Sequence, residues 1–281
     1  MWPTLGTIGG HSVYAYGVMI SLALGLWLVL AILFRERAGL TTGDVLNCAL
    51  LGIAAYLFAP KLWAMAKTGS FGVAAWLDLA RPWQQGATGT GPVVSAAALA
   101  WLGYCLIRRI PFLPLMDTQL PVVLLVMAVQ RIGCFLAGCC YGVPTALPWG
   151  VCFPLGSPAE LAYPGSAVHP TQLYYVLTFG SLAGLLFLVR PRPARAGAVT
   201  AVGWLGAGLA YACVTTLRGD HGAAPLSPWT TTTQLVALAF AAAGLALALA
   251  VWRRARILKS EFLSGPADAA QPVALSNRRI P

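Results

Sequence analysis

Charged side chains are rare in this sequence. Only 9% of the 281 residues are charged and 58% are hydrophobic, and the mean hydropathy is +0.74. A water-soluble domain has roughly 25% charged residues. This shortage excludes an ordinary soluble enzyme and predicts a protein whose main solvent is lipid.

Acidic residues are the scarcest charged group. The sequence has 8 Asp and Glu against 18 Lys and Arg, which gives a net charge of +10. A nucleic-acid-binding protein gathers such an excess on one face, but here the basic residues form short clusters between long apolar stretches. We therefore expect no nucleic-acid partner and assign the clusters to loops that border a membrane.

Apolar stretches of membrane-spanning character occur seven times along the chain. They cover approximately residues 12–34, 45–66, 92–107, 119–140, 171–189, 198–216 and 233–252, and the third is short. The sequence therefore predicts an all-α polytopic membrane protein of about seven transmembrane helices. Residues 1–258 would form this single membrane domain.

The predicted loops alternate between many and few basic residues along the chain. The loops after the first, third, fifth and seventh stretches hold eleven, whereas the other loops hold only Lys67, Arg81 and Arg218. Because Lys and Arg stay on the cytoplasmic side, the N-terminus is predicted to be outside and the C-terminus in the cytoplasm. Residues 259–281 are polar and rich in Pro and Ala, and we predict that they form a disordered cytoplasmic tail.

Two cations fall inside apolar stretches, where a charge costs about 2.5–3.5 kcal/mol on insertion. Lys61 lies late in the second stretch, so it either snorkels to the outer interface or belongs to a site. Arg131 lies well inside the fourth stretch. Its guanidinium either has a structural role, as a carbonyl cap or in an ion pair, or binds a lipid phosphate through two parallel hydrogen bonds. A helix would place Arg131, Cys134 and Gly138 on one face.

Other polar residues gather where helices should meet the outer surface. His169 precedes Pro170, which suits the first turn of a helix, so His169 is either structural or placed for proton transfer or headgroup contact. Arg218 either pairs with Asp220 or faces a headgroup. The Gly-rich loop at residues 86–91 is either an ordinary turn or a cradle for an anion.

The sequence contains seven cysteines. Three lie in apolar surroundings and are interpreted as small packing residues: Cys48, Cys105 and Cys213. The other four surround the outer end of the fourth stretch: Cys134, Cys139, Cys140 and Cys152. Their spacing is not that of a usual zinc site, and no metal is expected. They form either a disulfide from Cys139 or Cys140 to Cys152 or a reactive thiol.

Two motifs and several single positions match a known pattern in the same order. The run QRIGCFLAGCCYG at residues 130–142 is similar to G-R-x-x-N-F-x-N-x-E-x-x-G, and HPTQLY at residues 169–174 is similar to H-P-[ST]-Q-L-Y. Arg218 with Asp220 is similar to a closing R-x-x-D, and Lys61 stands where the pattern usually has Arg. From about Pro3 to Trp252 the chain thus resembles the bacterial prolipoprotein diacylglyceryl transferase family.

The resemblance implies a transferase of the bacterial cytoplasmic (inner) membrane that needs no cofactor. Such enzymes move a diacylglyceryl group from phosphatidylglycerol to the thiol of a lipobox cysteine in a prolipoprotein, and glycerol phosphate is released. Carried over by resemblance, Arg131 would hold the phosphate, Tyr16 and Gly138 would line the lipid site, and His169 and Gln172 would shape its outer mouth. The remaining lipid-binding residues that we expect are Lys61, Cys134 and Arg218.

Several positions depart from the family pattern. Cys134 and Ala137 replace its two Asn residues, Cys139 replaces its Glu, and the usual His before the third helix is missing. A membrane-embedded Arg is also missing near Tyr211. Either His169 or a Cys139 thiolate then acts as the base, or the protein performs other lipid chemistry, or it binds lipid without transfer. A membrane thiol or redox enzyme that uses Cys134, Cys139 and Cys140 is a further alternative.

Overall fold

The computed structural model describes residues 4–8, 11–79, 90–188, 195–220 and 231–263. A short antiparallel hairpin, β1 (Thr4–Ile8) and β2 (His11–Tyr14), comes first. The helices that follow are α1 (Ala15–Phe34), η1 (Arg35–Ala38), α2 (Thr42–Thr68), α3 (Val73–Leu79), α4 (Thr90–Arg108), α5 (Phe112–Ala137), α6 (Pro158–Ala162), α7 (Thr171–Leu188), α8 (Ala198–Thr215) and α9 (Thr232–Leu263).

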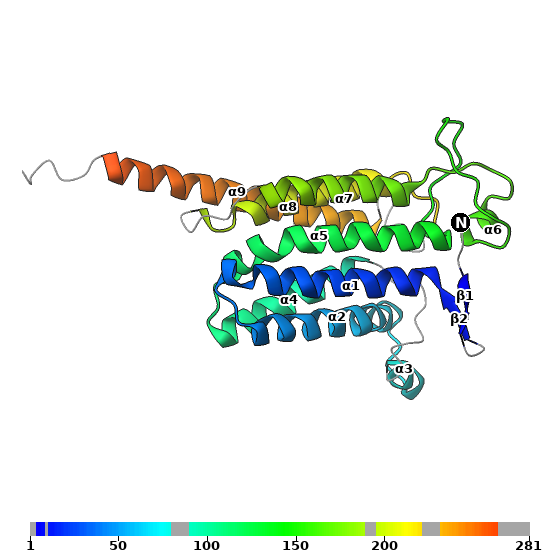
Figure 1. The fold of residues 1–281 in the computed structure, drawn as a ribbon, viewed down its shortest axis with the longest axis horizontal. Helices are drawn as coiled ribbons and strands as arrows, with labels where there is room; N and C mark the ends of the chain where they lie inside the picture. The colour runs from blue at the N-terminus through cyan, green and yellow to red at the C-terminus, as the bar shows by residue number, and fades with distance from the viewer. Residues whose placement is uncertain (1–3, 9–10, 80–89, 189–194, 221–230, 264–281) are drawn as a thin grey trace, which may run out of the picture.

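The long helices run side by side along the length of the molecule (Figure 1). The central helix is α5, because it packs against α1, α7 and α8, while α2 packs against α4 and α9 packs against α8. The hairpin and α6 lie at the end of the bundle where α5 ends and where α1 and α7 begin (Figure 1). We call this the site end, because the candidate site lies there.

Six helices in the described part of the chain are long and apolar enough to cross a membrane: Ala15–Ala38, Thr42–Thr68, Phe112–Ala137, Thr171–Leu188, Ala198–Thr215 and Thr233–Ile257. A further apolar helix, Val93–Arg108, is shorter and corresponds to the short third stretch. Large apolar side chains such as Leu33, Leu50 and Leu106 are exposed, as expected where helices contact lipid instead of water. The all-α polytopic prediction is confirmed, whereas the orientation of the termini stays a prediction.

The fourth predicted stretch differs most from the helix that the structure shows. α5 already begins at Phe112, because the polar side chains of Asp117 and Thr118 interrupt the apolar pattern without interrupting the helix. It ends at Ala137, where Gly138 has a φ of +71° and its N–H bonds to the carbonyls of the preceding turn. Gly138 therefore does not continue the helical face of Arg131 and Cys134, contrary to the expectation from periodicity.

Asp117 joins α5 to the start of α8 at the opposite end of the bundle. Its carboxylate is 1% exposed and accepts hydrogen bonds from the backbone N–H of Gly197 at 2.7 Å and of Thr200 at 2.8 Å. The Thr200 hydroxyl donates a third bond at 2.7 Å. A negative charge at a helix N-terminus is favoured by the helix dipole and by the unpaired N–H groups there. Sequence analysis did not single out this buried acid.

The C-terminal boundary differs slightly from the predicted one. α9 continues to Leu263, beyond the predicted end of the membrane domain at residue 258. Residues 264–281 lie outside the described part of the chain, so the tail stays a prediction.

Candidate functional site

Arg131 lies inside the bundle, about two turns before the end of α5. It is 2% exposed. The carbon of its guanidinium is 4.5 Å from the ring centroid of Tyr175 on α7 and 5.8 Å from that of Tyr211 on α8. Its Nη2 also donates to the Tyr211 hydroxyl at 3.4 Å. Three helices thus hold one guanidinium against two aromatic rings, a favourable environment for a desolvated cation.

The two tyrosines are fixed by each other and by Thr215. Their ring centroids lie 4.9 Å apart. The Thr215 hydroxyl donates to the Tyr211 carbonyl at 2.7 Å, which leaves its oxygen to accept the Tyr175 hydroxyl at 2.9 Å. Sequence analysis missed Tyr175, although it directly follows the HPTQLY motif and is one helical turn beyond Thr171.

Cys134, Cys139 and Cys140 come together next to this arginine. Their Sγ atoms all lie within 4.8 Å of one another. The chain turns back at Gly138 and again at Cys140, which has a φ of +59°. A non-glycine residue adopts such a left-handed conformation at a cost in backbone strain. Two left-handed residues so close together allow neighbouring thiols to point to the same place, which the sequence spacing alone did not suggest.

The charges around this cluster favour a thiolate on Cys140. Hydrogen bonds with the Cys134 and Cys139 thiols lower the pKa of Cys140 well below its ordinary value; burial opposes this, and the Arg131 and Arg218 guanidiniums lower the pKa further. Hydrogen bonds with the Cys134 and Cys140 thiols, together with burial, raise the pKa of Cys139. Of the two loop thiols, Cys140 is therefore the one whose surroundings favour the thiolate, and Cys139 is the one whose surroundings favour the protonated thiol.

The first turn of α7 ties down the loop that carries the cysteines. Thr171 and Gln172 are both fully buried. The Thr171 hydroxyl donates to the carbonyl of Cys140, and the Gln172 amide donates to the carbonyl of Cys139 at 2.8 Å. The side chain of Gln172 thus fixes the backbone of the cysteine loop, and its expected role at the mouth of a lipid site stays a prediction.

His169 lies just before α7, and its ring contacts Tyr174. Its Nδ1 is 3.0 Å from the hydroxyl of Tyr174, which also accepts a hydrogen bond from the indole N–H of Trp149 at 2.9 Å. The backbone of His169 is bonded on both sides, since its N–H donates to Val143 and its carbonyl accepts from Gly142, each at 3.0 Å. The half-buried imidazole is therefore held in a defined position.

Gly142 is the meeting point of three segments. A Cβ placed there would lie 2.5 Å from the Cβ of His169 and 2.8 Å from the carbonyl oxygen of Leu217. Gly142 also forms an isolated antiparallel bridge with Arg218. Only glycine permits this close approach, which places the His169 and Arg218 segments on either side of the cysteine loop.

Arg218 forms an ion pair with Asp220. Its Nε and Nη2 donate to the two carboxylate oxygens, each at 2.8 Å, in the bidentate arrangement that suits a guanidinium. Of the two alternatives that the sequence left open, the structure shows the ion pair. The side chain is 16% exposed, and its positive charge still acts on Cys140.

The other expected lipid-binding residues are placed as follows. The Tyr16 hydroxyl on α1 accepts a hydrogen bond from the side-chain amide of Gln130 at 3.2 Å. Gln130 directly precedes Arg131 in the sequence. Gly138 packs closely against Ser157, whose Cβ would lie 2.9 Å from an added Cβ. Lys61 is 8% exposed within α2, so the protein and not the interface surrounds its side chain.

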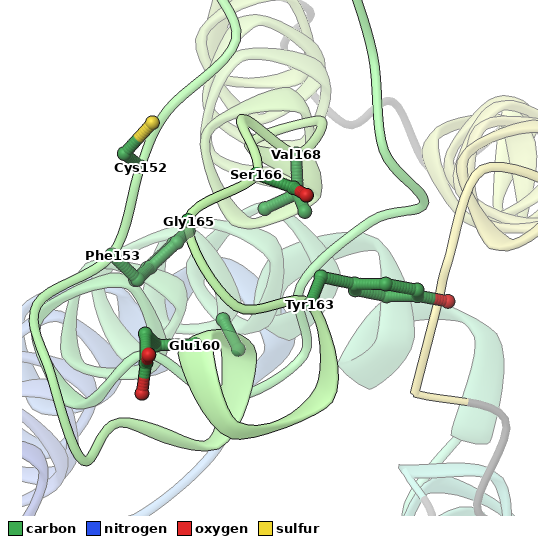
Figure 2. Close-up of a pocket in the computed structure, with 8 residues that line it drawn as sticks. Cys152, Phe153, Glu160, Tyr163, Gly165, Ser166 and Val168 are labelled. Carbon is green, nitrogen blue, oxygen red and sulfur yellow. The ribbon is translucent and has the colours of Figure 1, made fainter.

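Cys152 does not belong to the cysteine cluster. All seven cysteines are free thiols in the structure, so of the two alternatives that the sequence left open, the structure does not show the disulfide from Cys139 or Cys140 to Cys152. The hydrogen bonds from α7 provide the tether that the disulfide was expected to supply. Cys152 instead lines a separate small cavity with Phe153 and Tyr163 (Figure 2). Its volume of about 10 Å³ suits a water molecule and is too small for a headgroup.

The Gly-rich loop at residues 86–91 is described only at its end. Residues 80–89 are outside the described chain, so most of the Gly-rich loop at 86–91 stays a prediction.

The similarity of this chain to known proteins extends over most of its length. The model of one family, described as prolipoprotein diacylglyceryl transferase, matches residues 3–250. The chain belongs to this family. The match covers the hairpin and every helix that contributes to the site end, and it confirms the family resemblance of the two motifs.

Individual relatives carry the same description. The chain is 30% identical over 220 residues to the phosphatidylglycerol–prolipoprotein diacylglyceryl transferase of Clostridium tetani, a match that covers 78% of this chain and 86% of the relative. It is 28% identical over 188 residues to transferase 2 of Clostridium perfringens, covering 66% and 70%. With the transferase of Finegoldia magna it shares 24% identity over 259 residues, covering 91% and 97%.

Proposed function

We propose that this protein transfers a diacylglyceryl group from phosphatidylglycerol to the thiol of a lipobox cysteine in a prolipoprotein. The observation that carries the proposal is the position of Arg131, a fully buried guanidinium on the aromatic rings of Tyr175 and Tyr211. A cation kept at such a depth is costly unless it has a function or a partner. The phosphate of a phospholipid is complementary in charge to this guanidinium, while its acyl chains remain in the membrane.

The reaction requires one bond to form as another breaks. The acceptor sulfur bonds to the terminal glyceryl carbon of the diacylglyceryl group, and the bond from this carbon to the phosphate oxygen breaks. Negative charge grows on the departing glycerol phosphate, where a prepositioned guanidinium stabilises it. Arg131 has this role in our proposal.

The acceptor thiol must lose its proton to a base. We assign this role to His169, because its ring is held in position beside the cysteine loop by Tyr174 and by two backbone hydrogen bonds. An imidazole accepts a proton near neutral pH. Cys139 is less suited, since its hydrogen bonds and burial favour the protonated thiol.

The other site residues position these groups. Tyr16 and Gln130 join α1 to α5 beside Arg131, and Gln172 fixes the cysteine loop. Lys61, Cys134, Gly138 and Arg218 would complete the surroundings of the lipid. In the bacterial cytoplasmic membrane, with the predicted orientation, the site end would face outwards, where the lipobox peptide of a translocated prolipoprotein arrives.

A transfer assay with purified protein in detergent tests the proposal. The substrates are phosphatidylglycerol with a labelled acyl chain and a lipobox peptide. Arg131→Gln should lower the rate at least about 100-fold, the usual effect of removing a group that stabilises developing charge. Arg37→Gln is the matched control, because Arg37 also lies over an aromatic ring, that of Phe34 at 4.3 Å, but at the opposite end of the bundle.

The proposal fails if Arg131→Gln transfers as fast as the unchanged protein. Phosphatidylglycerol binding that requires Arg131, without any transfer to the peptide, would instead identify a lipid-binding protein that has no transferase activity.

A further inference from the structure

Three thiols occupy the part of the site where the family signature has Asn and Glu. Cys134 is buried at the end of α5, whereas Cys139 and Cys140 are half-buried in the loop that follows. Their Sγ atoms lie within 4.8 Å of one another, so small side-chain movements bring a pair to bonding distance. In the transfer proposed above, Cys134 only lines the lipid site, and none of the three sulfurs reacts.

The charges around the cluster distinguish one thiol from the other two. The guanidiniums of Arg131 and Arg218 both act on Cys140 and stabilise its thiolate. A thiolate beside arginine side chains is the nucleophilic form of cysteine. The same two positive charges oppose the binding of a metal cation by the cluster.

We propose that Cys134, Cys139 and Cys140 form a thiol–disulfide exchange centre, in which Cys140 attacks the disulfide of a substrate and Cys134 resolves the mixed disulfide. This activity goes beyond the diacylglyceryl transfer proposed above. The substrate class is a disulfide of a cysteine thiol, either in a polypeptide or in a small molecule such as oxidised glutathione.

The geometry selects Cys134 as the resolving thiol. Consecutive Cα atoms are about 3.8 Å apart, whereas disulfides need about 4.4–6.8 Å between their Cα atoms. Cys139 and Cys140 are consecutive and would form only a strained ring. Cys134 is in the preceding helix, and its Sγ lies within 4.8 Å of that of Cys140.

The exchange is balanced in two steps. The Cys140 thiolate bonds to one sulfur of the substrate disulfide, and the other sulfur leaves as a thiolate. Cys134 then loses its proton and attacks the Cys140 sulfur, which releases the second substrate thiolate. The substrate is reduced to two thiols, and the protein is oxidised to a Cys134–Cys140 disulfide, which an external dithiol reduces again.

Single Cys→Ser variants of the full chain in detergent test each role, with oxidised glutathione as the probe. The unchanged protein should form the internal disulfide, detected by non-reducing peptide mapping. Cys134→Ser should accumulate glutathione on Cys140, whereas Cys140→Ser should accumulate neither product. Cys152→Ser is the matched control, because this exposed thiol lies outside the cluster, and it should behave as the unchanged protein does.

The dependence on pH provides a second readout. Ordinary thiols titrate near about 8.5, so their alkylation slows about tenfold for each pH unit below that value. Because the pKa of Cys140 is lowered, its thiolate should persist to a lower pH than the thiolate of an ordinary cysteine does. Alkylation of Cys140 should therefore slow less with falling pH than alkylation of an ordinary thiol does. Arg218→Gln removes one of the charges that lower the pKa of Cys140, so it should make alkylation slow more steeply.

A disulfide-linked dimer of a lipobox peptide distinguishes the two substrate sources. Faster exchange with the peptide dimer than with oxidised glutathione assigns a polypeptide substrate, and the reverse assigns a small molecule. The proposal is overturned if the unchanged protein forms no internal disulfide with either probe, or if bound metal protects all three thiols until a chelator is added. None of these measurements contains phospholipid, so their failure is separate from a failure of the transfer assay.

Discussion

The guanidinium of Arg131 lies 4.5 Å from the ring centroid of Tyr175, although the two residues belong to different helices. Tyr175 is in turn stacked on Phe179 at 5.6 Å and is 0% exposed. Tyr175 thus packs between the Arg131 guanidinium and Phe179. Substitutions of Tyr175 and of Phe179 can therefore separate an effect on transfer from an effect on stability.

Replacement of Tyr175 by Leu should lower the rate of transfer by about 2-fold to 30-fold, which corresponds to about 0.5–2 kcal/mol for the lost cation–π interaction. Tyr175→Phe keeps the ring and should retain most of the activity. Phe179→Leu is the control, since it should reduce the thermal stability in detergent with a smaller effect on transfer. An equal loss of transfer in Phe179→Leu would show that only packing matters here.

The close packing at Gly142 predicts a large loss of stability in Gly142→Ala. The added methyl group would overlap His169 and the Leu217 carbonyl, and such overpacking costs about 1–3 kcal/mol. The melting temperature in detergent should therefore fall. Gly180→Ala is the matched control in α7, where an added Cβ meets nothing within 4 Å. Equal melting temperatures for the two variants would contradict the three-segment junction.

Asp117→Asn should destabilise the protein by about 2 kcal/mol, because a carboxylate that accepts three hydrogen bonds becomes a neutral amide. The effect should appear as a lower melting temperature with little change in transfer at temperatures where the variant is folded. Glu36→Gln, which changes a side chain that is 81% exposed, should alter stability by no more than about 0.5 kcal/mol. An unchanged melting temperature for Asp117→Asn would show that the Asp117 carboxylate does not stabilise the N-terminus of α8.

Two buried glutamines are expected to respond in opposite ways to replacement by Leu. Gln172→Leu removes the hydrogen bond to the Cys139 carbonyl, so it should lower stability by about 1–3 kcal/mol and speed alkylation of the cysteine loop. Gln119 is 3% exposed and makes no side-chain hydrogen bond within the described chain. Gln119→Leu should therefore be neutral or stabilising, and a melting curve for each variant decides between these outcomes.

The predicted orientation can be measured with reporters fused to the C-terminus. Green fluorescent protein fused there should fluoresce, and alkaline phosphatase should be inactive, because the basic loops favour a cytoplasmic C-terminus. Active phosphatase in this position would reverse the orientation and place the site end in the cytoplasm.

The sequence by itself determined the membrane class, the approximate positions of the helices and the presence of one charge, Arg131, well inside an apolar stretch. These features are local: hydropathy is summed along one stretch, and a charge inside an apolar run is conspicuous without any knowledge of its neighbours. The two motifs at residues 130–142 and 169–174 were also sufficient to indicate the family, which the comparison over residues 3–250 confirmed.

Only the tertiary structure decided what surrounds these residues. Tyr211 is 80 residues from Arg131 in sequence, and no local pattern reveals that pairing. The chain turns at the left-handed residues Gly138 and Cys140, and the thiols of Cys134, Cys139 and Cys140 lie together without Cys152, so the structure does not show the disulfide that the sequence had left open. Side-chain partners are set by how the helices and the loop pack in space, whereas apolar periodicity specifies only that a helix forms.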